Sequence, residues 1–257
     1  MALASVASAW LAYERSEVRK RQEVIAAIEQ LGGTVKYDTA QPFRPSWLRP
    51  LLGDTSVGEV VEVDFCDTQV TDVELGTIAG LTRLKQLDLD NTQVTDAGMV
   101  HVKNLKKLQG LDLSYTQVTD AGLTHLMGLK DLRGLVLNRT RVTDASLVHF
   151  AGLTKLEWLC LDKTQVSDIG LAHLASLTKL ELLSLDDTRL SNAGLAHFVG
   201  LKQLQVLYIE NTQVTDAGLV HLAKLPKLQG IFASGTQISR GGVSSLQKTL
   251  PKLQMFR

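Results

Sequence analysis

A segment of the sequence recurs eight times, and each copy starts 24 residues after the one before, as Thr92 follows Thr68. The motif TQVTD at residues 92–96 returns unchanged at 116–120 and 212–216. A fixed period of this length indicates stacked supersecondary units, each of which packs on its neighbours. The chain of 257 residues can therefore form one elongated domain without the single large core of an ordinary domain.

Each copy combines a strand pattern with a helix pattern. In the second copy, Leu87 and Leu89 alternate with polar residues, which predicts a short strand. Met99, Val102 and Leu105 follow at helical spacing, which predicts the inward face of a helix. Parallel strands need a crossover connection, so the repeated units predict a parallel sheet whose strands are joined by helices.

Polar residues also recur in columns. We expect the threonines to link adjacent repeats, because they follow the strand where backbone groups lose their sheet partners. They are Thr68, Thr92, Thr116, Thr140, Thr164, Thr188, Thr212 and Thr236. One aspartate stands beside a second threonine or a serine at most helix starts, which predicts helix caps rather than acid–base pairs. Gly98, replaced by Ser146 two copies later, indicates a position that needs a small residue.

With these features the repeat resembles the leucine-rich repeat, in a 24-residue variety found in many bacterial proteins. It is also similar to the repeats of F-box-associated leucine-rich adaptor proteins and of GALA-type effectors. The resemblance covers residues 60–256 and departs from the best-known repeats by carrying threonine where they carry asparagine or cysteine. It implies an α/β solenoid, a horseshoe with a parallel sheet on its concave face and helices on its convex face. It also implies protein binding as the usual role. No F-box is recognisable before the repeats, which makes a ubiquitin-ligase-type substrate adaptor the less favoured version.

The sequence divides into three regions. Residues 1–23 are either the remnant of a membrane anchor or the start of an N-terminal helix, because the uncharged run 2–13 is followed by a basic stretch. A membrane-spanning helix needs about 20 apolar residues, so the run is too short by itself. Residues 24–59 are expected to form an N-terminal cap that covers the open end of the stack. Residues 60–257 hold the eight repeats and a terminal strand stub at residues 253–256.

Within the expected cap, several patterns indicate secondary structure. One helical stripe consists of Val24 or Ile25, Ile28 and Leu31, and the helix ends at Gly32 and Gly33. The next expected elements are a short strand at 34–37, a loop at Pro42 and Pro45, and a short helix at 47–53.

Charge and cysteine content narrow the functional classes. Lysine plus arginine equals aspartate plus glutamate at 27 each, so no global basic excess points to nucleic acid. Cys66 and Cys160 lie four strands apart, roughly 19 Å at the usual strand spacing, which is too far for a disulfide. Free thiols fit a cytoplasmic location, and the alternative is a membrane-tethered protein.

Signatures of catalysis or metal binding are missing. The sequence has no phosphate-binding loop, no dinucleotide-binding glycine pattern and no serine in a G-x-S-x-G motif. The six histidines fall in one column with one per helix, so they form a line rather than the tetrahedral set that zinc needs. Cys160 has no predicted histidine partner, because that column lies on the helical side. We expect no cofactor, no metal and no enzymatic activity.

The positions that differ between copies are the candidate binding residues. In each copy they are the two outward-facing residues of the strand and one residue that follows the strand. None of these positions holds a lysine or an arginine. Acidic residues dominate the early copies, and aromatic and aliphatic residues with an acidic rim dominate the later ones, as at binding hot spots. The predicted partner-binding residues are Trp158, Cys160, Asp162, Leu182, Ser184, Asp186, Val206, Tyr208, Glu210 and Phe232.

These observations favour non-catalytic protein–protein recognition on the concave face by a monomer, with a partner that offers basic and apolar groups. The missing cations argue against nucleic acid as the partner, because phosphate contacts need cations. A membrane-tethered structural or envelope scaffold, held through residues 1–13, is the alternative.

Overall fold

The computed structural model describes residues 2–38 and 58–257. Ten strands form one sheet, in which the spatial order follows the order along the chain. Strands β2 to β10 are parallel, and β1 pairs antiparallel with β2. The strands are β1 (Thr34–Tyr37), β2 (Val60–Asp64), β3 (Gln86–Asp88), β4 (Gly110–Asp112), β5 (Gly134–Val136), β6 (Trp158–Cys160), β7 (Leu182–Ser184), β8 (Val206–Tyr208), β9 (Gly230–Phe232) and β10 (Gln254–Phe256).

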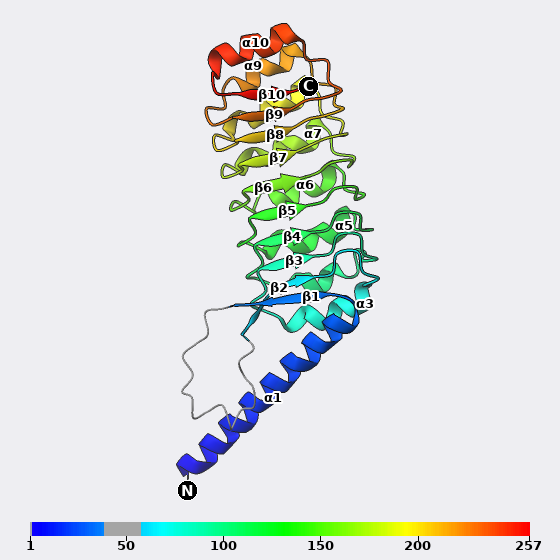
Figure 1. Ribbon diagram of the computed structural model, residues 1–257, viewed down its shortest axis with the longest axis vertical. Coiled ribbons are helices and arrows are strands. Elements are labelled where there is room, and N and C mark those ends of the chain that lie inside the picture. The colour runs from blue at the N-terminus through cyan, green and yellow to red at the C-terminus, as the bar shows by residue number, and fades with distance from the viewer. Residues whose placement is uncertain (1, 39–57) are drawn as a thin grey trace.

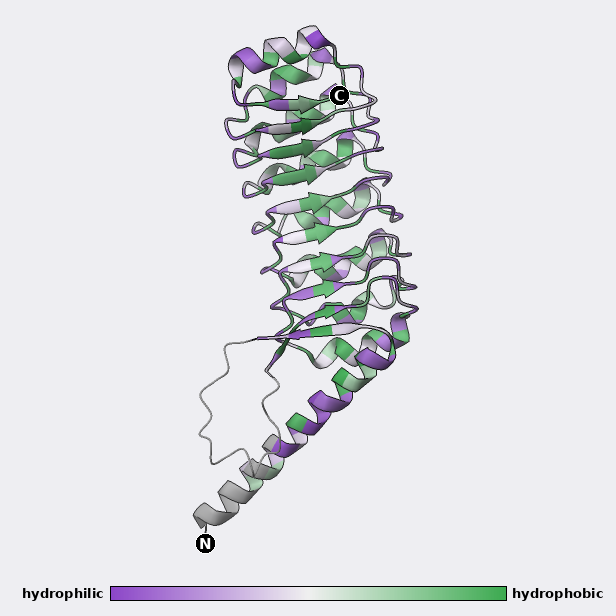
Figure 2. Cartoon of the chain, in the orientation of Figure 1, coloured by the Kyte–Doolittle hydropathy of each residue, from purple (hydrophilic) through white to green (hydrophobic). Residues whose placement is uncertain are grey.

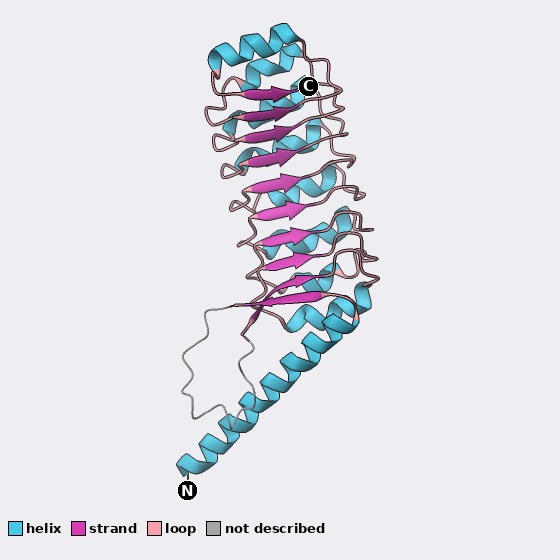
Figure 3. Ribbon diagram, in the orientation of Figure 1, coloured by secondary structure: helices cyan, strands magenta, loops and turns pink. Residues whose placement is uncertain are grey.

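Helices cover one face of the sheet and leave the other face open (Figures 1 and 3). Most repeats cross over through a short α-helix, a short 3-10 helix or both. The α-helices are α1 (Ala2–Gln30), α3 (Asp72–Leu75), α4 (Met99–Val102), α5 (Asp120–Leu123), α6 (Asp144–Phe150), α7 (Asp168–Leu171), α8 (Asn192–Leu195), α9 (Leu219–Leu222) and α10 (Arg240–Thr249). The 3-10 helices are η2 (Gly76–Gly80), η3 (Thr124–Gly128), η4 (Ala172–Ser176), η5 (Ala196–Gly200) and η6 (Asp216–Gly218). The predicted α/β leucine-rich repeat solenoid is confirmed.

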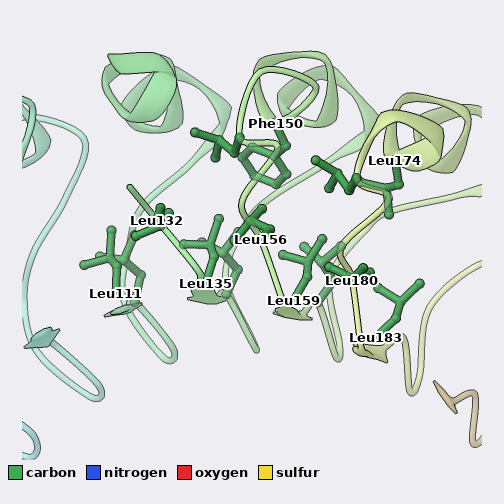
Figure 4. Close-up of a cluster of buried hydrophobic side chains, with 14 of the residues drawn as sticks. Leu111, Leu132, Leu135, Phe150, Leu156, Leu159, Leu174, Leu180 and Leu183 are labelled. Atoms are coloured by element: carbon green, nitrogen blue, oxygen red, sulfur yellow. The ribbon is translucent and has the colours of Figure 1, made fainter. Parts of the chain in front are cut away.

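The core lies between the strands and the helices. Figure 4 shows Leu135 and Leu159 pointing from their strands toward Phe150 on α6. These side chains are fully buried, as are Met99, Val102 and Leu105, the predicted inward positions. Hydrophobic residues occur in the strands, in the helices and in the segments between them, as the green parts of Figure 2 show. Burial of such residues is the main stabilising contribution, about 1.5–3 kcal/mol for each large aliphatic side chain.

The helix α1 starts at Ala2, so the uncharged run 2–13 is helical. Only its C-terminal part packs on the repeats, where Ile28 is fully buried and Ile25 nearly so. The helix projects from the end of the solenoid in Figure 1, and Trp10 and Tyr13 are exposed. These contacts support the predicted capping role for the part of residues 24–59 that the structure describes. The predicted loop at Pro42 and Pro45 and the helix at 47–53 lie outside the described residues.

The threonine column that follows the strands does not link the repeats, contrary to the sequence prediction. The Oγ1 of Thr92 donates to the carbonyl of Leu89 at 2.8 Å, within the same turn. The same bond, three residues back, recurs in every copy. The threonine therefore closes its own turn, where the chain leaves the sheet and a carbonyl needs a donor.

A second ladder joins adjacent repeats instead. The Asp96 carboxylate accepts the Thr119 backbone N–H at 2.7 Å and the Thr119 hydroxyl at 2.6 Å. The aspartates from Asp72 to Asp216 repeat this pairing with the residue 23 positions later, whereas Asn192 accepts the Thr215 N–H and donates from its Nδ2 to the Thr215 hydroxyl. Either the threonine or the aspartate at each helix start was predicted as the N-cap. The threonine or serine is the cap, as Thr119 is by accepting from Ala121, and the aspartate bridges to the next repeat instead.

The glycine or serine that stands two positions after most of these aspartates is explained by the same ladder. A Cβ atom on Gly122 would lie 2.5 Å from Oδ1 of Asp96, the atom that accepts the Gly122 N–H at 3.0 Å. A side chain larger than that of serine, which the equivalent position of the next copy holds as Ser146, would force these groups apart. In the preceding repeat, a Cβ atom on Gly98 would likewise lie 2.5 Å from Oδ1 of Asp72.

Candidate binding surface

Parallel pairing aligns the variable residues in columns on the open side of the sheet, here called the strand face. Glu62, Gln86 and Gly110 are register partners, and this column continues through Trp158 and Leu182. A second column runs from Asp64 to Phe232. The predicted alignment is confirmed, because strands in adjacent repeats pair without a shift.

The first half of the strand face contains an acidic hollow of about 410 Å³. Carboxylates of Glu62, Asp64, Asp88 and Asp112 line it, and Trp158 forms one wall. Burial raises the pKa of Asp88, and repulsion from neighbouring carboxylates adds to the shift. A hydrogen bond from the Asp90 backbone N–H opposes it but is a smaller effect than burial. Burial also raises the pKa of Asp112. The hollow thus concentrates negative charge that a cationic group would neutralise.

The indole of Trp158 lies over Gly134 rather than toward the later strands. A Cβ atom at Gly134 would be 1.8 Å from the indole Nε1, so only glycine leaves room for the ring. Trp158 is 38% exposed. The sequence predicted that Trp158 would gather with Leu182, Tyr208 and Phe232. The structure keeps Leu182 as its register partner but turns the indole toward Gly134 and the acidic hollow, away from Tyr208 and Phe232.

The second half of the strand face contains an aromatic stack. Tyr208 and Phe232 lie parallel with ring centroids 4.4 Å apart, and Phe232 and Phe256 follow at 4.6 Å. Phe256 was predicted only as part of a terminal strand, although its position 24 residues after Phe232 placed it in this column. Stacked rings of this kind offer rigid apolar area to a partner.

Carboxylates follow the strands beside this stack. The Asp162 Oδ1 atom accepts the Asp186 N–H at 2.9 Å, and the Asp186 Oδ1 atom accepts the Glu210 N–H at 2.6 Å. Asp162 and Asp186 therefore support the backbone as well as lining the surface. Burial raises the pKa of Asp186 to about 6, and repulsion from Asp162 and Glu210 adds to the shift.

Two predicted binding residues are partly or almost fully buried. Ser184 is 5% exposed and donates to Asp162 at 2.5 Å. Cys160 is half-buried, and burial together with the nearby Asp162, Asp112 and Asp186 raises the pKa of its thiol to about 12. The pKa of the Cys66 thiol is raised by burial to about 11. Thiols that stay protonated are poor nucleophiles.

One cation reaches the strand face through pairing that the sequence did not predict. Because β1 runs antiparallel beside β2, Lys36 lies opposite Glu62 and its Nζ atom is 2.6 Å from the carboxylate. Lys36 thus marks the N-terminal limit of the acidic hollow.

Among the described residues, no three histidine, cysteine, aspartate or glutamate side chains are grouped to hold a metal ion. No helix in 2–38 or 58–257 is both long and apolar enough to cross a membrane.

Comparisons with known proteins agree with this architecture. The family described as Leucine rich repeat matches residues 82–142. No curated protein sequence matches the chain. Internalin C2 of Listeria monocytogenes superposes with a TM-score of 0.66 at 25% identity, over 90% of this chain and 92% of that chain.

Two further solved structures match this chain over only about half of their own length. An internalin, inlF, of the same organism gives a TM-score of 0.56 at 25% identity, over 71% of this chain and 56% of that chain. A leucine-rich repeat protein of Leptospira interrogans gives a TM-score of 0.58 at 26% identity, over 71% of this chain and 45% of that chain. The likeness to GALA-type and F-box-associated repeats stays a prediction.

The fold and these similarities define the class of protein as a leucine-rich repeat solenoid. Proteins with such repeats generally act as protein–protein interaction modules, and they are typically non-catalytic.

Proposed function

We propose that this chain is a non-catalytic recognition module that binds a protein partner on the strand face. The observation that carries the proposal is the combination, on one open face, of an acidic hollow walled by Trp158 and a stack of aromatic rings. Exposed aromatic side chains beside charged rims are the residues that dominate binding energy at protein interfaces.

The partner offers basic and apolar groups. A lysine or arginine side chain would enter the acidic hollow, where it meets several carboxylates and the face of the Trp158 indole. Such a cation gains both charge pairing and a cation–π contact. Apolar side chains of the partner would cover Tyr208, Phe232 and Phe256.

Selection from a random peptide library tests the proposal without knowledge of the natural partner. The wild-type chain should enrich peptides that combine lysine or arginine with apolar residues. The variant Trp158→Ala with Tyr208→Ala should bind those peptides at least tenfold more weakly, a loss of about 1.4 kcal/mol or more.

The matched control removes two exposed apolar side chains from the helical side, through Ile169→Ala with Val220→Ala. These residues are 77% and 60% exposed. The control should bind like the wild type. Equal binding by the strand-face variant would exclude the strand face as the site.

A further inference from the structure

A second charged surface lies at the turns from helix to strand in the last three repeats, away from the strand face. A hollow of about 850 Å³ opens there between the ends of α9 and α10 and the residues that precede β8, β9 and β10. Its lining includes four lysines, Lys202, Lys224, Lys227 and Lys252. This volume is in the range of sites that hold ligands or peptide side chains.

The charge of this hollow is not neutralised as it is in earlier repeats. At the equivalent turns of the middle repeats, Asp131 pairs with Lys107 and Lys155, and Arg133 pairs with Glu157. None of the four lysines forms an ion pair with a described residue. Glutamines stand at the equivalent places instead, and one of them, Gln203, accepts from Lys227 Nζ at 2.5 Å.

The hollow has an apolar floor as well as a basic rim. Leu228 and Leu250 pack on the core beneath it, and Pro226 and Pro251 flank them. The described lining contains no aromatic ring on which a nucleic-acid base could stack. Lysines around aliphatic and proline side chains match an acidic polypeptide that also carries an apolar residue.

We propose that this basic hollow binds an acidic segment of a protein partner, with carboxylates at the lysines and an apolar side chain on the Leu228 floor. The interaction is independent of the strand face, whose own charge has the opposite sign. The solenoid would thus have two surfaces that select partner segments of opposite charge.

The test measures fluorescence anisotropy of a short labelled peptide that alternates glutamate and leucine, added to the full chain. The variant Lys202→Glu with Lys227→Glu should bind roughly tenfold more weakly or worse, because two attractive contacts become repulsive. Added salt should weaken the wild-type complex, because the lysines are at the surface.

A matched control exists three repeats earlier. Lys130 and Lys155 occupy the same repeat positions as Lys202 and Lys227. Lys130 donates to the Gly152 carbonyl at 3.1 Å, as Lys202 does to the Lys224 carbonyl at 2.9 Å. Lys130→Glu with Lys155→Glu makes the same change in net charge and should leave the affinity unchanged. Thermal melting of both variants checks that each is folded.

Three results would overturn the proposal. The wild type could fail to bind the peptide, or both double variants could lose affinity equally. Single-stranded DNA could also bind with the same dependence on Lys202 and Lys227, which would assign the hollow to polyanions in general. The strand-face variant Trp158→Ala with Tyr208→Ala should keep its affinity for the acidic peptide, so failure here is distinct from failure of the proposed function.

Discussion

One residue in each repeat adopts a left-handed backbone conformation at the turn after the strand. Seven non-glycine residues have φ between 52° and 58°, and Gly235 has 73°. Asparagine and glycine adopt this conformation readily, and Asn91, Asn211 and Gly235 fit it. Tyr115, Arg139 and Lys163 do not share that preference, so these repeats carry local strain.

Replacing a strained residue should stabilise the chain. Lys163→Asn should raise the free energy of unfolding by about 1 kcal/mol, because asparagine tolerates the left-handed region better than lysine. The lost ion pair with Asp187, 3.8 Å long and exposed, contributes little. Urea unfolding measures the change. Lys179→Asn, at an exposed position without a positive φ, is the control, and an equal effect in both variants would contradict the explanation.

A second residue-scale prediction concerns Asp186, whose pKa is raised to about 6 in the fold. The ordinary aspartate pKa is about 3.9, so the folded state binds more protons between these two values and stability falls as pH rises through this window. Asp186→Asn should therefore stabilise the chain at neutral pH by about 1 kcal/mol after allowance for solvent screening. The asparagine oxygen can still accept the Glu210 N–H.

Melting temperatures of Asp186→Asn and wild type across this pH range measure the effect. The gap between them should be largest above about pH 6 and should close below the ordinary aspartate pKa. A gap that does not change with pH would show that charge is not the cause.

At the scale of elements, each strand–helix unit is fastened to the next by a carboxylate. The ladder from Asp72 to Asp216 supplies two charge-assisted hydrogen bonds at every step between adjacent helix starts that have an aspartate. Hydrogen bonds from Ser239 lower the pKa of Asp216, as expected for an acceptor of strong bonds. The helix α8 starts with Asn192 in this position, which still accepts the Thr215 N–H but donates to the Thr215 hydroxyl instead of accepting from it.

Removing one step of the ladder should destabilise the stack. In the wild type, the Asp120 carboxylate accepts the Thr143 N–H at 2.9 Å and the Thr143 hydroxyl at 2.6 Å. Asp120→Ala leaves both donors without an acceptor and should lower the free energy of unfolding by about 2–3 kcal/mol. Asp120→Asn copies the arrangement at Asn192 and should cost less. Chemical denaturation compares the two. If Asp120→Asn were as damaging as Asp120→Ala, the bonds would not be the source of the stability.

The elements show which features a sequence pattern can predict. Leucine spacing determined the strands, the helices and their register, because a repeat of constant length aligns every strand with the next. The partner of each hydrogen bond was harder to predict. Thr92 and Asp96 are equally plausible as caps or links until the distance between repeats is known.

The sequence predicted which residues share the strand face, but it did not predict how each side chain is oriented. The columns on the strand face follow from the register, but the direction of one side chain does not. Trp158 could lean toward Gly134 or Leu182, and only the space above Gly134 decides. Lys36 joined the face through an antiparallel strand outside the repeats, where the period carries no information.

At the scale of the whole molecule, a formal net charge of zero conceals strong segregation. The strand face is acidic, and the hollow at the last helix-to-strand turns is basic. Charge separated in this way governs which partners approach which surface, and it favours specificity more than overall affinity.

This segregation predicts different pH responses for the two surfaces. Lowering the pH through about 6 protonates Asp186 and should weaken binding of a basic peptide to the strand face. The lysines of the basic hollow stay charged there, so an acidic peptide should keep its affinity until its own carboxylates protonate near pH 4. Anisotropy titrations of both peptides at several pH values measure this. Parallel weakening of the two complexes would contradict it.

The central claim is that the partner covers Trp158 on the strand face, and fluorescence of that residue tests it most directly. In a variant with Trp10→Phe and Trp47→Phe, Trp158 is the sole tryptophan left of the three. Titration with a selected basic and apolar peptide should shift its emission to shorter wavelength and saturate at the concentrations that saturate binding. Saturable binding that leaves Trp158 emission unchanged would place the partner elsewhere.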